Sequence, residues 1–194
     1  MSNDAVTTDM IAELMDSQLS DTNVQKLQRQ RQKDSGRFEK YIEVLQSRVP
    51  WDEPILLRLT DHLYIVQGAH GARTVRCSCG NDFGDYRVNW KLGSRIRVRR
   101  ETSQMEEVYS PAYAAPEAGW IEVREYFCPT CATQLAVEAV PPGYPPLFDM
   151  FPDLDTFYRD VLGTPLRDED PSWYTDKTLD VTEAWMKELD NARD

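Results

Sequence analysis

Two cysteine pairs constrain the fold of this chain more than any other feature. They occur in the strings Cys77-Ser-Cys79-Gly80 and Cys128-Pro-Thr-Cys131-Ala132, and each follows a strand-like run and is followed by a small residue. A turn after a strand directs two sulfur atoms and several backbone N–H groups at one point, and zinc prefers four thiolates at about 2.3 Å. The spacing predicts a structural zinc site with four ligands: Cys77, Cys79, Cys128 and Cys131.

The same cysteines have two alternative interpretations, a redox pair and buried free thiols. A reactive CxxC pair needs its first cysteine at a helix N-terminus, which lowers the pKa of the thiol, whereas Cys131 leads into the strand pattern QLAVEAV. Four cysteine ligands leave no coordination position for an activated water molecule. We therefore expect the metal to stabilise the fold and not to catalyse a reaction.

The apolar pattern of the middle of the chain predicts strands. The runs ILLRL, HLYIVQ and TVRC are short and β-rich, and apolar and polar residues alternate at 95–99, 121–124 and 135–138. Closely spaced strands without intervening helices favour a mainly antiparallel sheet. Residues 102–108 are expected to form a helical turn between two of these strands.

Both ends of the chain show helical spacing of apolar residues. Two short helices are expected in the first thirty residues, with Ser20 and Asp21 as candidate N-caps. A third helix spans 38–45 after the candidate cap Ser35. Toward the other end we expect a helix at 154–161 that ends at Gly163, and a last helix that begins with a capping box of Asp180 and Glu183.

These elements together predict an α+β protein. The expected fold is a mainly antiparallel β core with a zinc-knuckle, zinc-ribbon-like site of four cysteines, flanked by N-terminal and C-terminal helices and extended arms. The predicted organisation has three parts: an N-terminal helical arm at 1–50, a zinc-binding β domain at 51–142, and a proline- and aromatic-rich arm with the C-terminal helices at 143–194.

The string VPPGYPPLFDMFP begins near the last of these boundaries and contains five prolines. Proline cannot donate to a strand ladder, so an extended path is expected here. Its aromatic residues Tyr144, Phe148 and Phe151 belong either to the core of this chain or to an interface. An extended segment with large apolar side chains favours burial by a second protein.

The net negative charge of the chain argues against several classes of binding partner. The chain has 33 acidic and 22 basic residues among 194, which gives a net charge of −11 and argues against nucleic acids and anionic membranes as ligands. No run approaches the ~20 apolar residues of a membrane span, and the first residues do not resemble a secretion signal. We therefore expect a cytoplasmic protein with reduced thiols.

A basic stripe interrupts this acidic background. Arg95, Arg97 and Arg99 share one face of their predicted strand, with Lys91 and Arg100 close by. The stripe is either a solvated edge that discourages pairing between sheets or a contact for an anion or an acidic partner. The phosphate-binding and hydrolase motifs GxxxxGK[ST], GxGxxG, HExxH and GxSxG are all absent, so no catalytic residue is predicted.

Several long strings, in one order, resemble the acetone carboxylase gamma subunit family. They lie between residues 38 and 165 and are YIEVLQSRVPWDEPILL, YIVQ, CSCGNDFGDYRVNWKL, REYFCPTC and VEAVPPGYPPLFDMFPDLDTFY. The chain also resembles, more distantly, the zinc-containing small subunit of acetophenone carboxylase. It departs from the pattern in a longer N-terminus, an acidic extension after Arg167, and Ala132 in place of a glycine.

The resemblance implies a role in a multi-subunit, biotin-independent carboxylase, a ligase that joins acetone and bicarbonate into acetoacetate at the expense of ATP. In that family two larger subunits, alpha and beta, bind the nucleotide and carry a manganese-type metal, whereas the small subunit supplies zinc and scaffold. The four cysteines carry over as zinc ligands. A free-standing zinc-ribbon module that binds proteins and a dithiol redox protein are the competing hypotheses.

Overall fold

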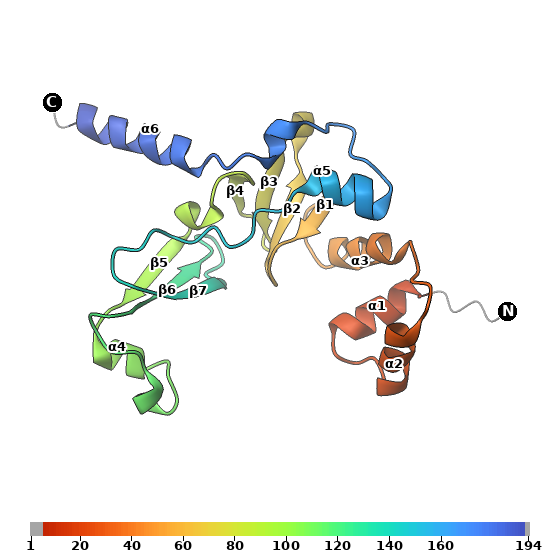
Figure 1. Cartoon of the computed structure of the whole chain (residues 1–194), viewed down its shortest axis with the longest axis horizontal. Coiled ribbons are helices and arrows are strands. Elements are labelled where there is room, and N and C mark those ends of the chain that lie inside the picture. Colours follow the sequence, from red (N-terminus) through yellow and green to blue (C-terminus); the bar gives the residue numbers. More distant parts are fainter. Residues whose placement is uncertain (1–5, 193–194) are drawn as a thin grey trace.

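Two antiparallel sheets occupy the middle of the molecule, and helices pack around or extend from them (Figure 1). The computed structural model describes residues 6–192, apart from the side chain of His70. The predicted α+β class with antiparallel strands is confirmed, although the strands form two sheets and not one. Within the described residues no helix combines the length and the apolar character needed to cross a bilayer.

The larger sheet has the strand order β1-β2-β3-β4 and consists of β1 (Ile55–Arg58), β2 (Leu63–Gln67), β3 (Arg73–Cys77) and β4 (Asp82–Asp85). Strand β2 is buried on both faces: Leu63 and Ile65 join the main core, while Tyr64 and Val66 pack in a cluster with residues of helix α3 (Arg37–Gln46). The sequence pattern predicted β1, β2 and β3. Strand β4 was not predicted.

The smaller sheet has the order β5-β6-β7 and consists of β5 (Arg95–Arg99), β6 (Glu122–Phe127) and β7 (Gln134–Val140). All three strands match predicted runs. The expected helical turn between the first two is α4 (Thr102–Glu106), which lies at the end of the sheet farthest from the larger one (Figure 1). Shorter 3-10 turns in the chain are η1 (Ala69–Gly71), η2 (Trp90–Gly93), η3 (Ala112–Ala114) and η5 (Pro171–Tyr174).

The two expected N-terminal helices are α1 (Thr8–Met15) and α2 (Asp21–Arg29). Ser20 caps α2 as predicted, because its hydroxyl accepts a hydrogen bond from the backbone N–H of Asn23. The prediction that Ser35 caps α3 is wrong. The capping residue is Gly36, whose own N–H donates to the Asp34 carboxylate at 2.9 Å, so the chain turns one residue later than expected.

The last two helical segments also differ from the expectation in detail. Helix α5 (Leu154–Thr156) continues as a π-helix over Phe157–Leu162 and ends at Gly163, which has the left-handed φ of 71° that favours glycine. The predicted capping box at Asp180 is wrong, because α6 (Thr178–Asn191) begins three residues earlier than an N-cap at Asp180 requires. There the Asp176 carboxylate accepts from the N–H of Thr178 at 2.8 Å.

One apolar core joins the two sheets. It combines Leu63, Ile65 and Val75 of the larger sheet with Tyr126 of the smaller one and with Leu154 of α5, all almost fully buried. A separate cluster holds α1, α2 and α3 together. Burial on this scale contributes about 25 cal/mol for each Å² of apolar surface, so the contact between the sheets is a major source of stability. The division into three parts at residues 50 and 142 stays a prediction.

Candidate metal centre

The sulfur atoms of the four cysteines meet at one place between the two sheets. All four Sγ atoms lie within 4.8 Å of one another, with 3.9 Å between Cys77 and Cys131 and 3.7 Å between Cys79 and Cys128. Four sulfurs placed about 2.3 Å from one tetrahedral ion are about 3.8 Å apart. The cluster therefore has the dimensions of a site for a single four-coordinate metal ion, and all four cysteines are free thiols.

Each sheet contributes one pair of cysteines from the turn that joins two neighbouring strands. Cys77 ends β3 and Cys79 lies in the turn to β4, while Cys128 follows β6 and Cys131 lies in the turn to β7. Both turns are closed by the same backbone pattern. The N–H of Cys77 donates to the carbonyl of Asn81 at 2.8 Å, and the N–H of Cys128 donates to the carbonyl of Thr133 at 2.9 Å.

The residue after each second cysteine has a left-handed backbone. Gly80 has φ of 97° and Ala132 has φ of 58°. Glycine adopts this conformation freely, whereas the Cβ atom of alanine costs roughly 1–2 kcal/mol there. The departure noted at Ala132 in the sequence is thus a local backbone strain in the second knuckle, and the four sulfur atoms still cluster with this alanine present.

Replacing Ala132 by glycine is expected to stabilise the chain. The relief of strain exceeds the roughly 0.4–1 kcal/mol that the extra freedom of glycine adds to the unfolded state, so the free energy of unfolding should rise by about 0.5–1 kcal/mol. Chemical denaturation measures it. The matched control Ala136→Gly, in strand β7, should lower stability instead. A loss of stability in Ala132→Gly would contradict the strain argument.

Two further contacts hold the knuckles in place. The Thr130 hydroxyl donates to the side-chain oxygen of Asn81 at 2.7 Å and so connects the second turn to the first. The indole N–H of Trp51 donates to the carbonyl of Cys77 at 3.2 Å. Neither residue was identified from the sequence, because Trp51 lies 26 positions before Cys77 and nothing in its surroundings marks it as a neighbour of the site.

The cysteines differ in burial and in acidity. Cys77 and Cys128 are buried and Cys131 is exposed. Burial raises the pKa of Cys77 to about 12, whereas a hydrogen bond with the Thr133 hydroxyl, 3.1 Å from Sγ, lowers the pKa of Cys131 to about 6. Four thiolates so close together repel one another strongly. A divalent cation removes that repulsion, so the donor set fits a soft metal such as zinc.

Comparison with known proteins identifies the family to which this chain belongs. The family model described as the acetone carboxylase gamma subunit matches residues 49–162, which is more than half of the chain and includes all four cysteines. The chain belongs to the acetone carboxylase gamma subunit family. The family resemblance of the sequence strings is thereby confirmed.

Two curated relatives agree with this assignment to the acetone carboxylase gamma subunit family. The acetone carboxylase gamma subunit of Xanthobacter autotrophicus is 45% identical over 164 residues, which are 84% of this chain and 96% of the relative. The acetophenone carboxylase beta subunit of Aromatoleum aromaticum is 32% identical over 79 residues, which are 40% of this chain and 61% of that protein. Both relatives are named as subunits of carboxylases, and this supports a carboxylase-subunit role.

In this member of the acetone carboxylase gamma subunit family, the predicted basic stripe is largely neutralised within the chain. Arg99 is buried, and its guanidinium bonds to the carboxylates of Glu125 and Glu107, both at 2.7 Å. Arg97 is half-exposed and pairs with Glu107 at 3.3 Å. Both interpretations of the stripe, a solvated edge and a contact for an anion or an acidic partner, are therefore wrong for Arg99, because its carboxylate partners lie within this chain, on the neighbouring strand and just after α4.

Lys91 does not belong to the stripe either. Its side chain is fully buried, and the ammonium group donates to Glu138 at 2.5 Å, to the carbonyl of Leu147 at 2.8 Å and to the carboxylate of Asp149. The Glu138 carboxylate also accepts from the hydroxyl of Tyr126 at 2.7 Å. Through this buried network, the proline-rich segment of this chain is bound to strand β7.

The aromatic residues of the proline-rich segment divide between the core and the surface. Phe151 stacks on Phe148 and on Tyr174, with ring centroids 5.3 and 5.1 Å apart, and it also packs against the buried Tyr86. Phe151 is thus partly buried against the core of this chain, which favours the first of its two interpretations. Tyr144 remains 47% exposed and is available for a partner.

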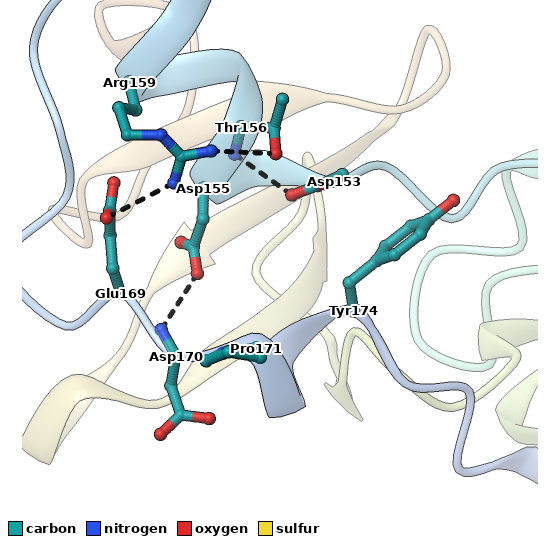
Figure 2. A pocket seen from close by; sticks show the side chains of 8 residues that line it. All are labelled: Asp153, Asp155, Thr156, Arg159, Glu169, Asp170, Pro171 and Tyr174. Atoms are coloured by element: carbon teal, nitrogen blue, oxygen red, sulfur yellow. Dashed lines mark hydrogen bonds and ion pairs between the residues drawn. The ribbon is translucent and has the colours of Figure 1, made fainter.

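A hollow of about 460 Å³ lies beside α5, and four of its eight lining residues carry carboxylates (Figure 2). Its polar groups bond to one another: Asp155 accepts from the N–H of Asp170 at 3.1 Å, and Arg159 contacts Glu169 at 3.4 Å. Among the side chains that the structure describes, which exclude His70, the cysteine cluster is the only group of three or more possible metal ligands that come together. We therefore infer that the residues lining this hollow hold the segment around residue 170 against α5, and that the hollow is not a metal site.

Proposed function

We propose that this chain is the small, zinc-binding, structural subunit of an ATP-dependent, biotin-independent ketone carboxylase. The complex would join acetone and bicarbonate into acetoacetate, a ligase reaction that forms a C–C bond. Two larger subunits, alpha and beta, would bind ATP and a manganese-type metal and carry the catalytic residues. The observation that carries the proposal is the family match over a range that contains all four clustered cysteines.

The role proposed for the metal follows from its donor set. Cys77, Cys79, Cys128 and Cys131 would fill all four positions of a tetrahedral zinc ion, so no position remains for water or a substrate. The ion would supply a rigid connection between the sheets. The chain would then be non-catalytic, and its contribution would be to shape and hold the larger subunits.

The experiment is the production of the chain together with the two large subunits from the same organism. A tag on one large subunit isolates the complex, and mass spectrometry measures its subunits and metals. We expect one zinc ion per small chain and formation of acetoacetate from acetone, bicarbonate and ATP, with acetophenone as the test of the acetophenone-type alternative. If the small chain stays apart as a monomer, it is a free-standing zinc-ribbon module and the proposal fails.

Limited proteolysis tests whether the proline-rich segment contacts a large subunit. The exposed residues Tyr144, Leu147 and Met150 lie on its outer side. These side chains are already about half buried, so covering each one completely contributes roughly 0.7–1.5 kcal/mol, and several together would hold the segment. We expect a broad-specificity protease to cut residues 142–150 in the free chain and at least about tenfold more slowly in the complex. Equal cutting in both states would assign these residues to a free surface.

A further inference from the structure

Helix α6 is attached to the larger body of the chain near its first residue. The N–H of Lys177 donates to the carbonyl of Arg87 at 2.9 Å, and the hydroxyl of Thr178 accepts from the N–H of Asn89 at 3.0 Å. Beyond that point the helix extends away from both sheets (Figure 1), and none of its 14 residues is buried. Isolated helices of this length are marginally stable in water, because helices in proteins are stabilised mainly by packing of an apolar face.

An apolar stripe runs along this unpacked helix. It consists of large side chains that are 45–72% exposed: Leu179, Trp185, Met186 and Leu189. At 100° per residue these four side chains fall within about one third of the circumference of the helix, so they lie on one face. Scattered apolar residues on a surface are ordinary, but a continuous stripe of this size on one projecting helix is typical of an interaction site.

Carboxylates border the stripe. At 100° per residue, Glu183 and Asp190 lie along one side of it and Glu188 lies along the other, while the single lysine, Lys187, lies on the opposite face. The rim of the stripe is therefore acidic on both sides. When a partner covers the stripe, the residues around its binding surface come close to these carboxylates. Basic residues there make the contact more favourable, and acidic residues make it less favourable.

We propose that α6 docks its apolar stripe into an apolar groove with a lysine- and arginine-rich rim on a large subunit of the carboxylase. The proposal rests on the proposed function, which supplies the large subunits. A second copy of this chain fits less well, since two copies of α6 would bring their acidic rims together. An anionic membrane is disfavoured by the same charges.

The stripe has the features of a helix that binds in a groove. Such helices present anchors at positions i, i+3, i+4 and i+7, and tryptophan is among the residues that contribute most to binding at interfaces. Trp185 lies near the middle of α6, with Leu179 on one side and Leu189 on the other. Trp185 is thus the expected central anchor, and Glu183 and Glu188 are the expected partners of basic residues on the rim.

The test titrates the purified full chain onto the purified pair of large subunits. The double variant Trp185→Ala/Leu189→Ala should bind at least about 30-fold more weakly than the unaltered chain. The matched control Asp180→Ala/Lys187→Ala removes two side chains from the opposite face and should change binding less than about threefold. Because none of these residues is buried, melting temperature and bound zinc should stay the same in both variants.

Charge reversal supplies a second measurement. Glu183→Lys/Glu188→Lys should weaken binding at low salt by at least about tenfold and flatten its dependence on salt. Failure of the unaltered chain to bind would refute the proposed function. Unaltered binding by Trp185→Ala/Leu189→Ala would refute only the docking role of α6. If that variant instead dissociates a dimer of the free chain, the occupant is a second copy and the inference is overturned.

Discussion

Replacing Cys128 by serine is expected to remove the metal and to destabilise the contact between the sheets. Cys128 is fully buried between them, and a serine hydroxyl is a poor substitute for a thiolate. A structural zinc site contributes its binding free energy to folding, and losing one of four ligands should cost at least about 3–5 kcal/mol. Metal analysis should show bound zinc falling close to zero, and melting should occur roughly 10 °C lower.

Ser78, which lies between the proposed ligands Cys77 and Cys79, offers a matched control. Its backbone N–H donates to the carbonyl of His62 at 2.9 Å, and alanine would keep this hydrogen bond. Ser78→Ala should therefore keep both the metal and the melting temperature. A Cys128→Ser/Cys131→Ser chain that still held a full complement of zinc would rule out the assignment of the ligands.

Replacing Lys91 by methionine is the second change with a large expected effect. Methionine fills the same space but removes the nearest cation of Glu138, whose side chain is 4% exposed, and leaves only Arg124 at 3.9 Å. Removing one partner of a buried ion pair costs about 3–5 kcal/mol, because the remaining charge stays in an apolar environment. The variant should melt roughly 10 °C lower, and a protease should cut residues 146–149 several times faster than in the unaltered free chain, while the chain is still folded.

Two further variants show whether the loss of stability comes from the unpaired buried charge or from the loss of any lysine. Lys187→Met changes a lysine on the outer face of α6 and should leave melting unchanged. In Lys91→Met/Glu138→Gln the unpaired charge is gone, and the amide oxygen still accepts from Tyr126, so at least about half of the lost stability should return. If the double variant were as unstable as Lys91→Met alone, packing and not charge would explain the loss.

Local patterns predicted a large part of this structure. The runs that form β2 and β5 show the composition and alternation typical of strands. The CxC and CxxC spacings predicted the two cysteine turns, because each turn is formed by residues that are adjacent in the sequence. Strand β4 escaped prediction, because DFGD contains two aspartates and a glycine and is ordered by pairing with β3. The formation of two sheets likewise depends on contacts that no short segment encodes.

Charged residues account for several of the errors. Lys91 and Arg99 were expected in the basic stripe, yet both are buried against carboxylates of this chain, and Arg73 is buried in the same way. Lys91 and Glu138 are 47 residues apart, and Arg73 reaches Asp155 at 2.6 Å. A sequence shows the charges but not their distances in space, so pairing of this kind became visible only with the three-dimensional fold.

The division of the cysteines between two sheets has a consequence for how the chain matures. Cys79 and Cys128 are 49 residues apart, so the proposed ion closes a long loop much as a disulfide would, and such a closure removes about 4 kcal/mol of conformational freedom from the unfolded chain. Each hairpin forms locally within microseconds, but the ion is held by four sulfurs only after both hairpins have met. Metal binding would then be a late step in maturation. The supply of zinc in the cell would limit how many chains are ready for assembly.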